Sequence, residues 1–198
     1  MLKNFIIKTK TKTKTKTKSK TKSKIVSNCL KELDYYGYTK IDKFLNNIQS
    51  QHFLNLVNRE YSKINKNKKF RYKGVPQRNN YDKLLYNLFN IDHDFIKLLD
   101  QPIIREIAKK KLNDPYYSFL PADKPNYCLS YYNARSSGKK LDLHIDSHIP
   151  YISEYTFSLQ FVFLLEDSNI DNGCTTAVPG SHKSGKFTDR SIKKLEHI

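Results

Sequence analysis

Residues 141–148 read Leu-Asp-Leu-His-Ile-Asp-Ser-His and place His144 two positions before Asp146. In an extended strand, residues i and i+2 face the same side of the sheet. An imidazole and a carboxylate on one face can bind the same metal ion. The same two side chains could also form an ordinary ion pair at the end of a strand. The motif therefore predicts a candidate metal site with His144 and Asp146 as two of its ligands.

The segments that follow this motif have the composition of strands and tight turns. Residues 157–165 form an apolar run, residues 172–174 read Asn-Gly-Cys, and residues 178–183 read Val-Pro-Gly-Ser-His-Lys. Glycine suits both turns because it adopts positive φ without steric cost. We interpret His182, which lies in the second turn, as a structural residue of the loop and not as a metal ligand.

The apolar pattern places helices first and strands second along the chain. Helical spacing predicts helices over residues 48–64, 81–90 and 94–112, with Pro102 near the first turn of a helix. Segments of β character, separated by Gly, Pro, Asn and Asp, predict strands over residues 35–41, 116–120, 127–132, 141–146, 157–165 and 175–178. This order indicates an α+β protein whose helices pack outside a sheet or barrel.

The basic charge of the chain is concentrated near its start. The formal net charge is +17, and nine lysines alternate with Thr or Ser over residues 8–24. Like charges at every second position and a lack of apolar side chains predict disorder. We therefore expect a disordered arm over residues 1–24 and one folded domain over residues 25–198. The arm is either a solvated tail or an electrostatic arm that binds nucleic acid or another polyanion.

The cysteines and the apolar runs restrict the class of protein. The three cysteines, Cys29, Cys128 and Cys174, lack CxxC spacing, so neither a disulfide framework nor a zinc site is predicted. A reducing compartment, and hence an intracellular and cytoplasmic protein, is the expectation. The longest purely apolar run, residues 161–165, is far shorter than the roughly 20 residues of a membrane span. We therefore expect no membrane-spanning helix.

The order of these motifs resembles the phytanoyl-CoA dioxygenase family. The resemblance is carried by residues 36–45, Tyr-Gly-Tyr-Thr-Lys-Ile-Asp-Lys-Phe-Leu, and above all by the block from His144 to Lys183. It implies a double-stranded β-helix of the jelly-roll or cupin type. It also implies Fe(II) and 2-oxoglutarate as cofactors and a small-molecule substrate. Related halogenases carry a small residue in place of the aspartate, so Asp146 implies hydroxylation.

The resemblance also implies a distal histidine ligand, followed by an arginine that binds the far carboxylate of 2-oxoglutarate. His197 is the one later histidine, no arginine follows it, and Arg190 precedes it. We therefore expect an incomplete β-helix that lacks its C-terminal part. Alternatively, a second chain completes the site, or His197 serves as an irregular third ligand. The positions nearest to the family's cosubstrate pocket are Leu129 and Val162, although both are more simply interpreted as core residues.

Two other hypotheses remain open at this stage. The chain could be a non-catalytic scaffold that binds a polyanion through residues 8–24. It could also hold an independently evolved cupin-like metal site in which His148 or His182 joins His144 and Asp146.

Overall fold

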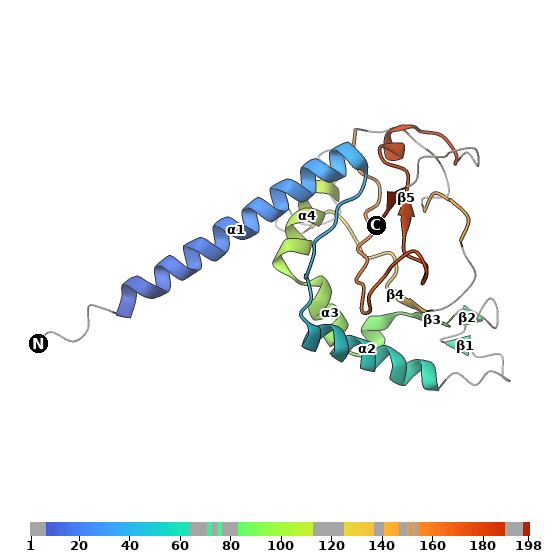
Figure 1. The fold of residues 1–198 in the computed structure, drawn as a ribbon, viewed down its shortest axis with the longest axis horizontal. Coiled ribbons are helices and arrows are strands. Elements are labelled where there is room, and N and C mark those ends of the chain that lie inside the picture. The colour runs from blue at the N-terminus through green and yellow to red at the C-terminus, as the bar shows by residue number, and fades with distance from the viewer. Residues whose placement is uncertain are drawn as a thin grey trace, which may run out of the picture.

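The computed structural model describes residues 7–63, 71–72, 75–76, 83–112, 125–136, 141–146, 150, 152, 154–188 and 196–198. Its helices are α1 (Ile7–Tyr36), α2 (Asn47–Ser62), α3 (Asp94–Leu99) and α4 (Pro102–Leu112), with 3-10 turns η1 (Leu88–Asn90) and η2 (Ser181–Lys183). The strands are β1 (Arg71–Tyr72), β2 (Val75–Pro76), β3 (Lys83–Tyr86), β4 (Asn133–Ser136), β5 (Thr176–Ala177) and β6 (Glu196–His197). They pair antiparallel as β1–β2, β3–β4 and β5–β6. The α+β class is thus confirmed, with the helices on one side of the strands (Figure 1).

Helix α1 ends at a glycine, where the sequence predicts a strand. Gly37 adopts φ +87°, and its amide donates a 3.1 Å hydrogen bond to the carbonyl oxygen of Leu33. A left-handed glycine just after the last helical residue is a common way to end a helix. The strand predicted over residues 35–41 is therefore wrong, because its first two residues complete the last turn of α1 and Gly37 turns the chain away.

Helix α1 also includes residues 8–24, where the sequence predicts a disordered arm. These residues are continuous with the packed end of the helix, where Val26 and Cys29 are buried against Ile107 of α4. A segment held by packing supplies the nucleus from which a helix can extend. The binding of a polyanion by residues 8–24 stays a prediction. Among the described residues, no helix combines the length and the apolar character that a membrane span requires.

Helix α2 matches the helix predicted over residues 48–64. It begins with a capping box, in which the Asn46 side chain accepts from the Gln49 amide and the Gln49 side chain accepts from the Asn46 amide. These two bonds satisfy backbone donors that an uncapped helix start leaves unpaired. The inner face of the helix buries four residues at helical spacing, namely Phe53, Leu56, Val57 and Tyr61.

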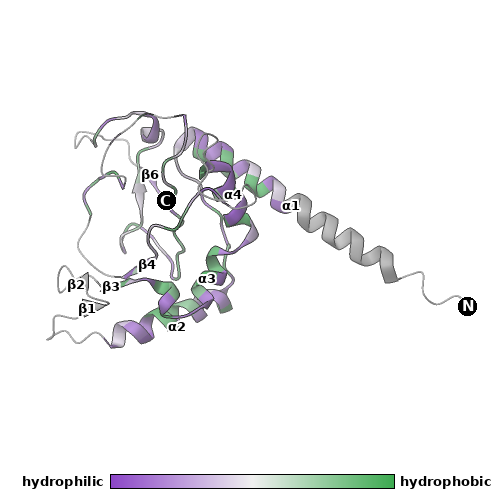
Figure 2. Cartoon of the chain, turned by 180° about the vertical axis from the view of Figure 1, so that it is seen from behind, coloured by the Kyte–Doolittle hydropathy of each residue, from purple (hydrophilic) through white to green (hydrophobic). Residues whose placement is uncertain are grey.

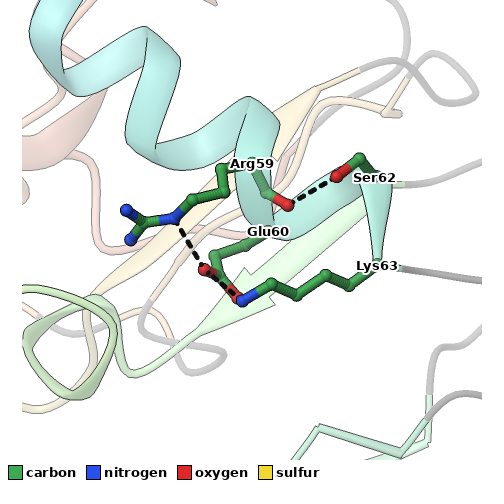
Figure 3. Close-up of polar contacts among 4 residues, drawn as sticks. All are labelled: Arg59, Glu60, Ser62 and Lys63. Atoms are coloured by element: carbon green, nitrogen blue, oxygen red, sulfur yellow. Dashed lines mark hydrogen bonds and ion pairs between the residues drawn. The ribbon is translucent and has the colours of Figure 1, made fainter.

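The last turn of α2 carries a cluster of charges around Glu60. Lys63 Nζ lies 2.8 Å and Arg59 Nε lies 3.2 Å from Glu60 Oε1, as Figure 3 shows. Burial alone would raise the pKa of the Glu60 carboxyl, but hydrogen bonds from Lys63 and Arg59 bring it below its ordinary value. Ser62 adds a 2.7 Å hydrogen bond to the Arg59 carbonyl oxygen. The cluster therefore stabilises the end of the helix with Glu60 ionised.

The segment after α2 differs from the sequence prediction. The helix predicted over residues 81–90 is wrong, because residues 83–86 form β3, paired with β4, and only residues 88–90 form a 3-10 turn. The helix predicted over residues 94–112 is divided into α3 and α4. Pro102 is the first residue of α4, which confirms its place in a first helical turn.

Two clusters of buried residues form the core. One joins α2, β3, η1 and α3, where Figure 2 shows apolar residues gathered, and the other joins α1 to α4. Residues 157–165 contact both clusters at every second position. Leu159 and Phe161 pack against the α1–α4 cluster, whereas Phe163 and Leu165 pack against the other cluster. The contacts alternate along this segment, but residues 157–165 do not form the strand that the sequence predicts.

The remaining predicted strands have mixed outcomes. Residues 175–178 contain β5, as predicted, whereas residues 127–132 and 141–146 form no strand. Strand β4 begins just after the first of these segments, at Asn133. The strand predicted over residues 116–120 lies outside the described residues.

Candidate metal centre

His144 and Asp146 face one another, although residues 141–146 do not form the strand that the sequence predicts. Nε2 of His144 lies 3.2 Å from Oδ1 of Asp146, and each side chain is about half exposed. Nδ1 of His144 lies 2.7 Å from the carbonyl oxygen of Asp142. A carbonyl oxygen can only accept, so Nδ1 carries the proton in this contact. In a neutral imidazole, Nε2 then keeps its lone pair and points it at the carboxylate.

This arrangement fits two neighbouring corners of an octahedral metal ion. Metal bonds of about 2.1 Å to nitrogen and oxygen, set at right angles, place the two ligand atoms about 3 Å apart. The 3.2 Å between His144 Nε2 and Asp146 Oδ1 is close to that separation. The bond from His144 to the Asp142 carbonyl oxygen supplies the outer contact that orients metal-binding histidines. The same pair forms an ordinary ion pair when the imidazole is protonated.

A residue far along the chain supports the backbone beside His144. The hydroxyl of Thr188 donates a 3.1 Å hydrogen bond to the carbonyl oxygen of Leu143. Residues 141–146 form no strand, so this contact takes part of the role that strand pairing would have in holding them. Nothing in the sequence around Thr188 indicates this pairing.

His197 does not complete a three-residue site with His144 and Asp146. Its Nδ1 lies 3.5 Å from Cys174 Sγ and 3.3 Å from Thr176 Oγ1. In the part of the chain that the structure describes, no three His, Cys, Asp or Glu side chains gather closely enough to hold a metal ion. His148 and Arg190, both considered from the sequence, lie outside the described residues.

His182 contacts the end of α1. Its ring lies against Gly37, and the Gly180 amide donates a 2.8 Å hydrogen bond to the Tyr36 carbonyl oxygen. Partial burial of the His182 ring lowers its pKa below the ordinary value of 6.5, while a hydrogen bond with the Asp34 backbone opposes the shift. Gly180 adopts φ +76° as the turn requires. The structural interpretation of His182 therefore agrees with its position, and the cupin-like alternative that used His182 has no support from the geometry.

Comparison with models of known protein families gives a match to this chain. The profile of the phytanoyl-CoA dioxygenase (PhyH) family matches residues 33–195, which is most of the chain. The chain belongs to this family. The matched range includes His144 and Asp146 and stops two residues before His197. No curated protein and no solved structure matches the chain.

The two positions proposed for the family's cosubstrate pocket are not core residues. Leu129 is 55% exposed and Val162 is 61% exposed. The reading of either residue as core is therefore wrong. Leu129 lines an open groove of ≈ 380 Å³ together with Tyr131, Phe89 and Ile96. Val162 lies on the outward side of residues 157–165, whose inward side faces the two core clusters.

Proposed function

We propose that the chain is an oxygenase that depends on Fe(II) and 2-oxoglutarate and hydroxylates a small organic substrate. Family membership supports the reaction class. The observation that carries the proposal is the pairing of His144 Nε2 with Asp146 Oδ1 at 3.2 Å, with the other ring nitrogen bonded to a carbonyl oxygen. The family's double-stranded β-helix is part of this proposal, and residues 157–165 and the β5–β6 pair are our candidates for its strands.

The chain's own residues prepare the site in three ways. The Asp142 carbonyl oxygen keeps the proton on His144 Nδ1, so that Nε2 can donate its lone pair to a cation. Asp146 adds a negative charge beside that nitrogen. When bound, iron and 2-oxoglutarate supply the oxidising power for inserting an oxygen atom into a C–H bond, which no side chain can supply. A carboxylate at position 146, in place of a small residue, leaves no room there for a halide and favours hydroxylation.

We assign two protein ligands, His144 and Asp146, and leave the third to experiment. His148 and a residue of a second chain are the candidates, because His197 does not join His144 and Asp146 in the structure. We do not assign His182 as a ligand, as the cupin-like alternative would require, because its ring is held against Gly37.

The first experiment measures Fe(II) binding under anaerobic, reducing conditions, and then succinate formation from 2-oxoglutarate in air. The wild-type chain is compared with Asp146→Ala and with Asp142→Ala. Asp142 contributes its backbone carbonyl oxygen, which alanine retains, so it is a matched control two residues from His144. We expect Asp146→Ala to lose at least about tenfold in metal affinity, and Asp142→Ala to bind as the wild type does.

Equal metal binding by Asp146→Ala and the wild type would contradict the assignment. The third ligand is then sought with His148→Ala, with His182→Ala as the control under the same conditions. We expect His182→Ala to keep its metal. A loss confined to His148→Ala would indicate that His148 is the third ligand.

A further inference from the structure

A second group of reactive side chains lies on the β5–β6 pair. Thr176 of β5 stands opposite His197 of β6 in the strand register. Cys174 precedes Thr176 by two residues, so an extended backbone turns both side chains to the same face. Nδ1 of His197 lies 3.5 Å from Cys174 Sγ and 3.3 Å from Thr176 Oγ1. Strand pairing therefore brings a thiol, a hydroxyl and an imidazole together at one ring nitrogen.

The backbone on each side of this group is held in place. The Ile198 amide donates a 2.8 Å hydrogen bond to the Thr175 carbonyl oxygen, just after His197. Just before His197, the carboxylate of Glu196 accepts a hydrogen bond from the Tyr38 hydroxyl. Two residues before β5, the Cys174 amide donates a 2.9 Å hydrogen bond to the Asn169 carbonyl oxygen. The approach of His197 to Cys174 is thus built into the fold by several independent contacts.

The three cysteines of the chain have different surroundings. Cys29 is buried in the core, Cys128 is exposed, and Cys174 is half-buried beside an exposed imidazole. The thiolate is the nucleophilic form of cysteine, and a base within hydrogen-bonding reach promotes its formation. Cys174 is the residue of the three that combines access from solvent with a recorded contact to a base.

We propose that Cys174 is an oxidation site for hydrogen peroxide, with His197 as the proton acceptor. The thiol proton passes to Nδ1 of His197, and the sulfur attacks one peroxide oxygen. An S–O bond forms as the O–O bond breaks, and the departing hydroxide takes the proton back from His197 to give water. The sulfur loses two electrons and becomes a sulfenic acid, while the peroxide is reduced. Once Nδ1 of His197 has taken the proton, it donates a hydrogen bond to the Thr176 hydroxyl oxygen, which holds the imidazole in position.

The test measures the nucleophilicity of each thiol in the intact chain. Iodoacetamide is added in the presence of EDTA, so that a metal at His144 and Asp146 has no part in the result. Alkylation of Cys174 and Cys128 is followed by peptide mass spectrometry. We expect Cys174 to react faster than Cys128, although Cys128 is the more exposed thiol. This wild-type comparison needs no substitution and so does not depend on how a variant folds.

Substitutions then assign the effect to His197. His197→Gln is expected to slow the alkylation of Cys174 about tenfold or more, because a positioned base contributes at least that much to a proton transfer. The alkylation rate of Cys128 should not change. His182→Gln is the matched control, because it makes the same substitution in a histidine that contacts Gly37. Circular dichroism of each variant checks that the fold is kept.

Oxidation itself is measured with hydrogen peroxide, followed by dimedone to trap the sulfenic acid. We expect the dimedone adduct on Cys174, and less of it in His197→Gln. The proposal is overturned if Cys174 reacts no faster than Cys128 in the wild type, or if His197→Gln leaves the Cys174 rate unchanged. A dimedone adduct that forms on Cys128 but not on Cys174 would overturn it as well.

Discussion

The ring of His182 lies so close over Gly37 that a Cβ atom at position 37 would stand 2.5 Å from its Nδ1. Gly37 also has φ +87° and ends helix α1. Beside this contact, the Gly180 amide bonds to the Tyr36 carbonyl oxygen. One glycine therefore serves both the end of the first helix and the docking of a turn that comes more than 140 residues later.

Gly37→Ala is expected to destabilise the fold for two separate reasons. A positive φ costs an alanine about 1–2 kcal/mol, and the clash with the His182 ring adds about 1–3 kcal/mol. Gly173→Ala is the control, because Gly173 has the same φ of +87° and no atom within 4 Å of the added Cβ. Urea denaturation should show a larger loss for Gly37→Ala than for Gly173→Ala. In a His182→Ala background the two losses should become similar, and a persistent difference would contradict the clash.

Stability is expected to fall between pH 7.5 and pH 5 because of His182. Its pKa is lowered in the folded chain, so the unfolded chain takes up the proton first as the pH falls through 6.5. Asp34, Lys183 and Lys111 are the charged groups that act on this ring. The difference in unfolding free energy between the two pH values should be smaller in His182→Gln. The pKa values of the Glu60 and Asp94 carboxyl groups are also lowered. Their ordinary pKa values are 4.5 and 3.8, so both groups titrate below this pH range.

Glu60→Gln is expected to destabilise the end of α2 by about 1 kcal/mol, because it weakens charge-assisted bonds from Lys63 and Arg59. Glu106→Gln, an exposed position on α4, serves as the control. The difference between the wild type and Glu60→Gln should disappear as the pH falls below 4.5, because protonation of Glu60 removes the same charge. Chemical denaturation at pH 7 and at pH 3 measures both effects.

Thr188→Val is expected to lower the metal affinity of the proposed centre. The substitution removes the bond to the Leu143 carbonyl oxygen, which lies one residue before His144. Loss of such a supporting contact typically costs about tenfold or more in metal affinity. Because the bond from Thr188 is exposed, we expect a loss at the low end of that range. Thr188→Ser keeps the hydroxyl and should bind Fe(II) as the wild type does. If both variants bind equally well, Thr188 has no role in positioning His144.

A peptide of residues 8–24 is expected to show little helix by circular dichroism at low salt. Threonine is a poor helix former, the lysines repel one another, and an isolated segment must supply its own helix nucleus. A peptide of residues 8–36 should be only slightly more helical, because Val26 and Cys29 need α4 for their burial. Deletion of residues 8–24 from the full chain should change the unfolding free energy by less than about 0.5 kcal/mol. A larger loss would mean that the Lys-Thr segment itself stabilises the fold.

Local patterns in the sequence were sufficient for the features whose causes lie within a few residues. They predict helix α2, the place of Pro102 at the start of α4, and the positive φ of Gly180 in its turn. Membership of the oxygenase family follows from the same ordered motifs.

The wrong strand at residues 35–41 has a local cause, the left-handed Gly37 that ends α1. The other main errors and omissions concern contacts between distant segments. Residues 83–86 form a strand and not a helix because they pair with residues 133–136, and no local pattern contains that partner. The contact of His182 with Gly37 and that of His197 with Cys174 arise in the same way. Helical spacing and turn residues act through the neighbouring backbone, whereas these pairs depend on which surfaces the core brings together. Packing of the folded chain is therefore what places His197 beside a thiol and not beside Asp146.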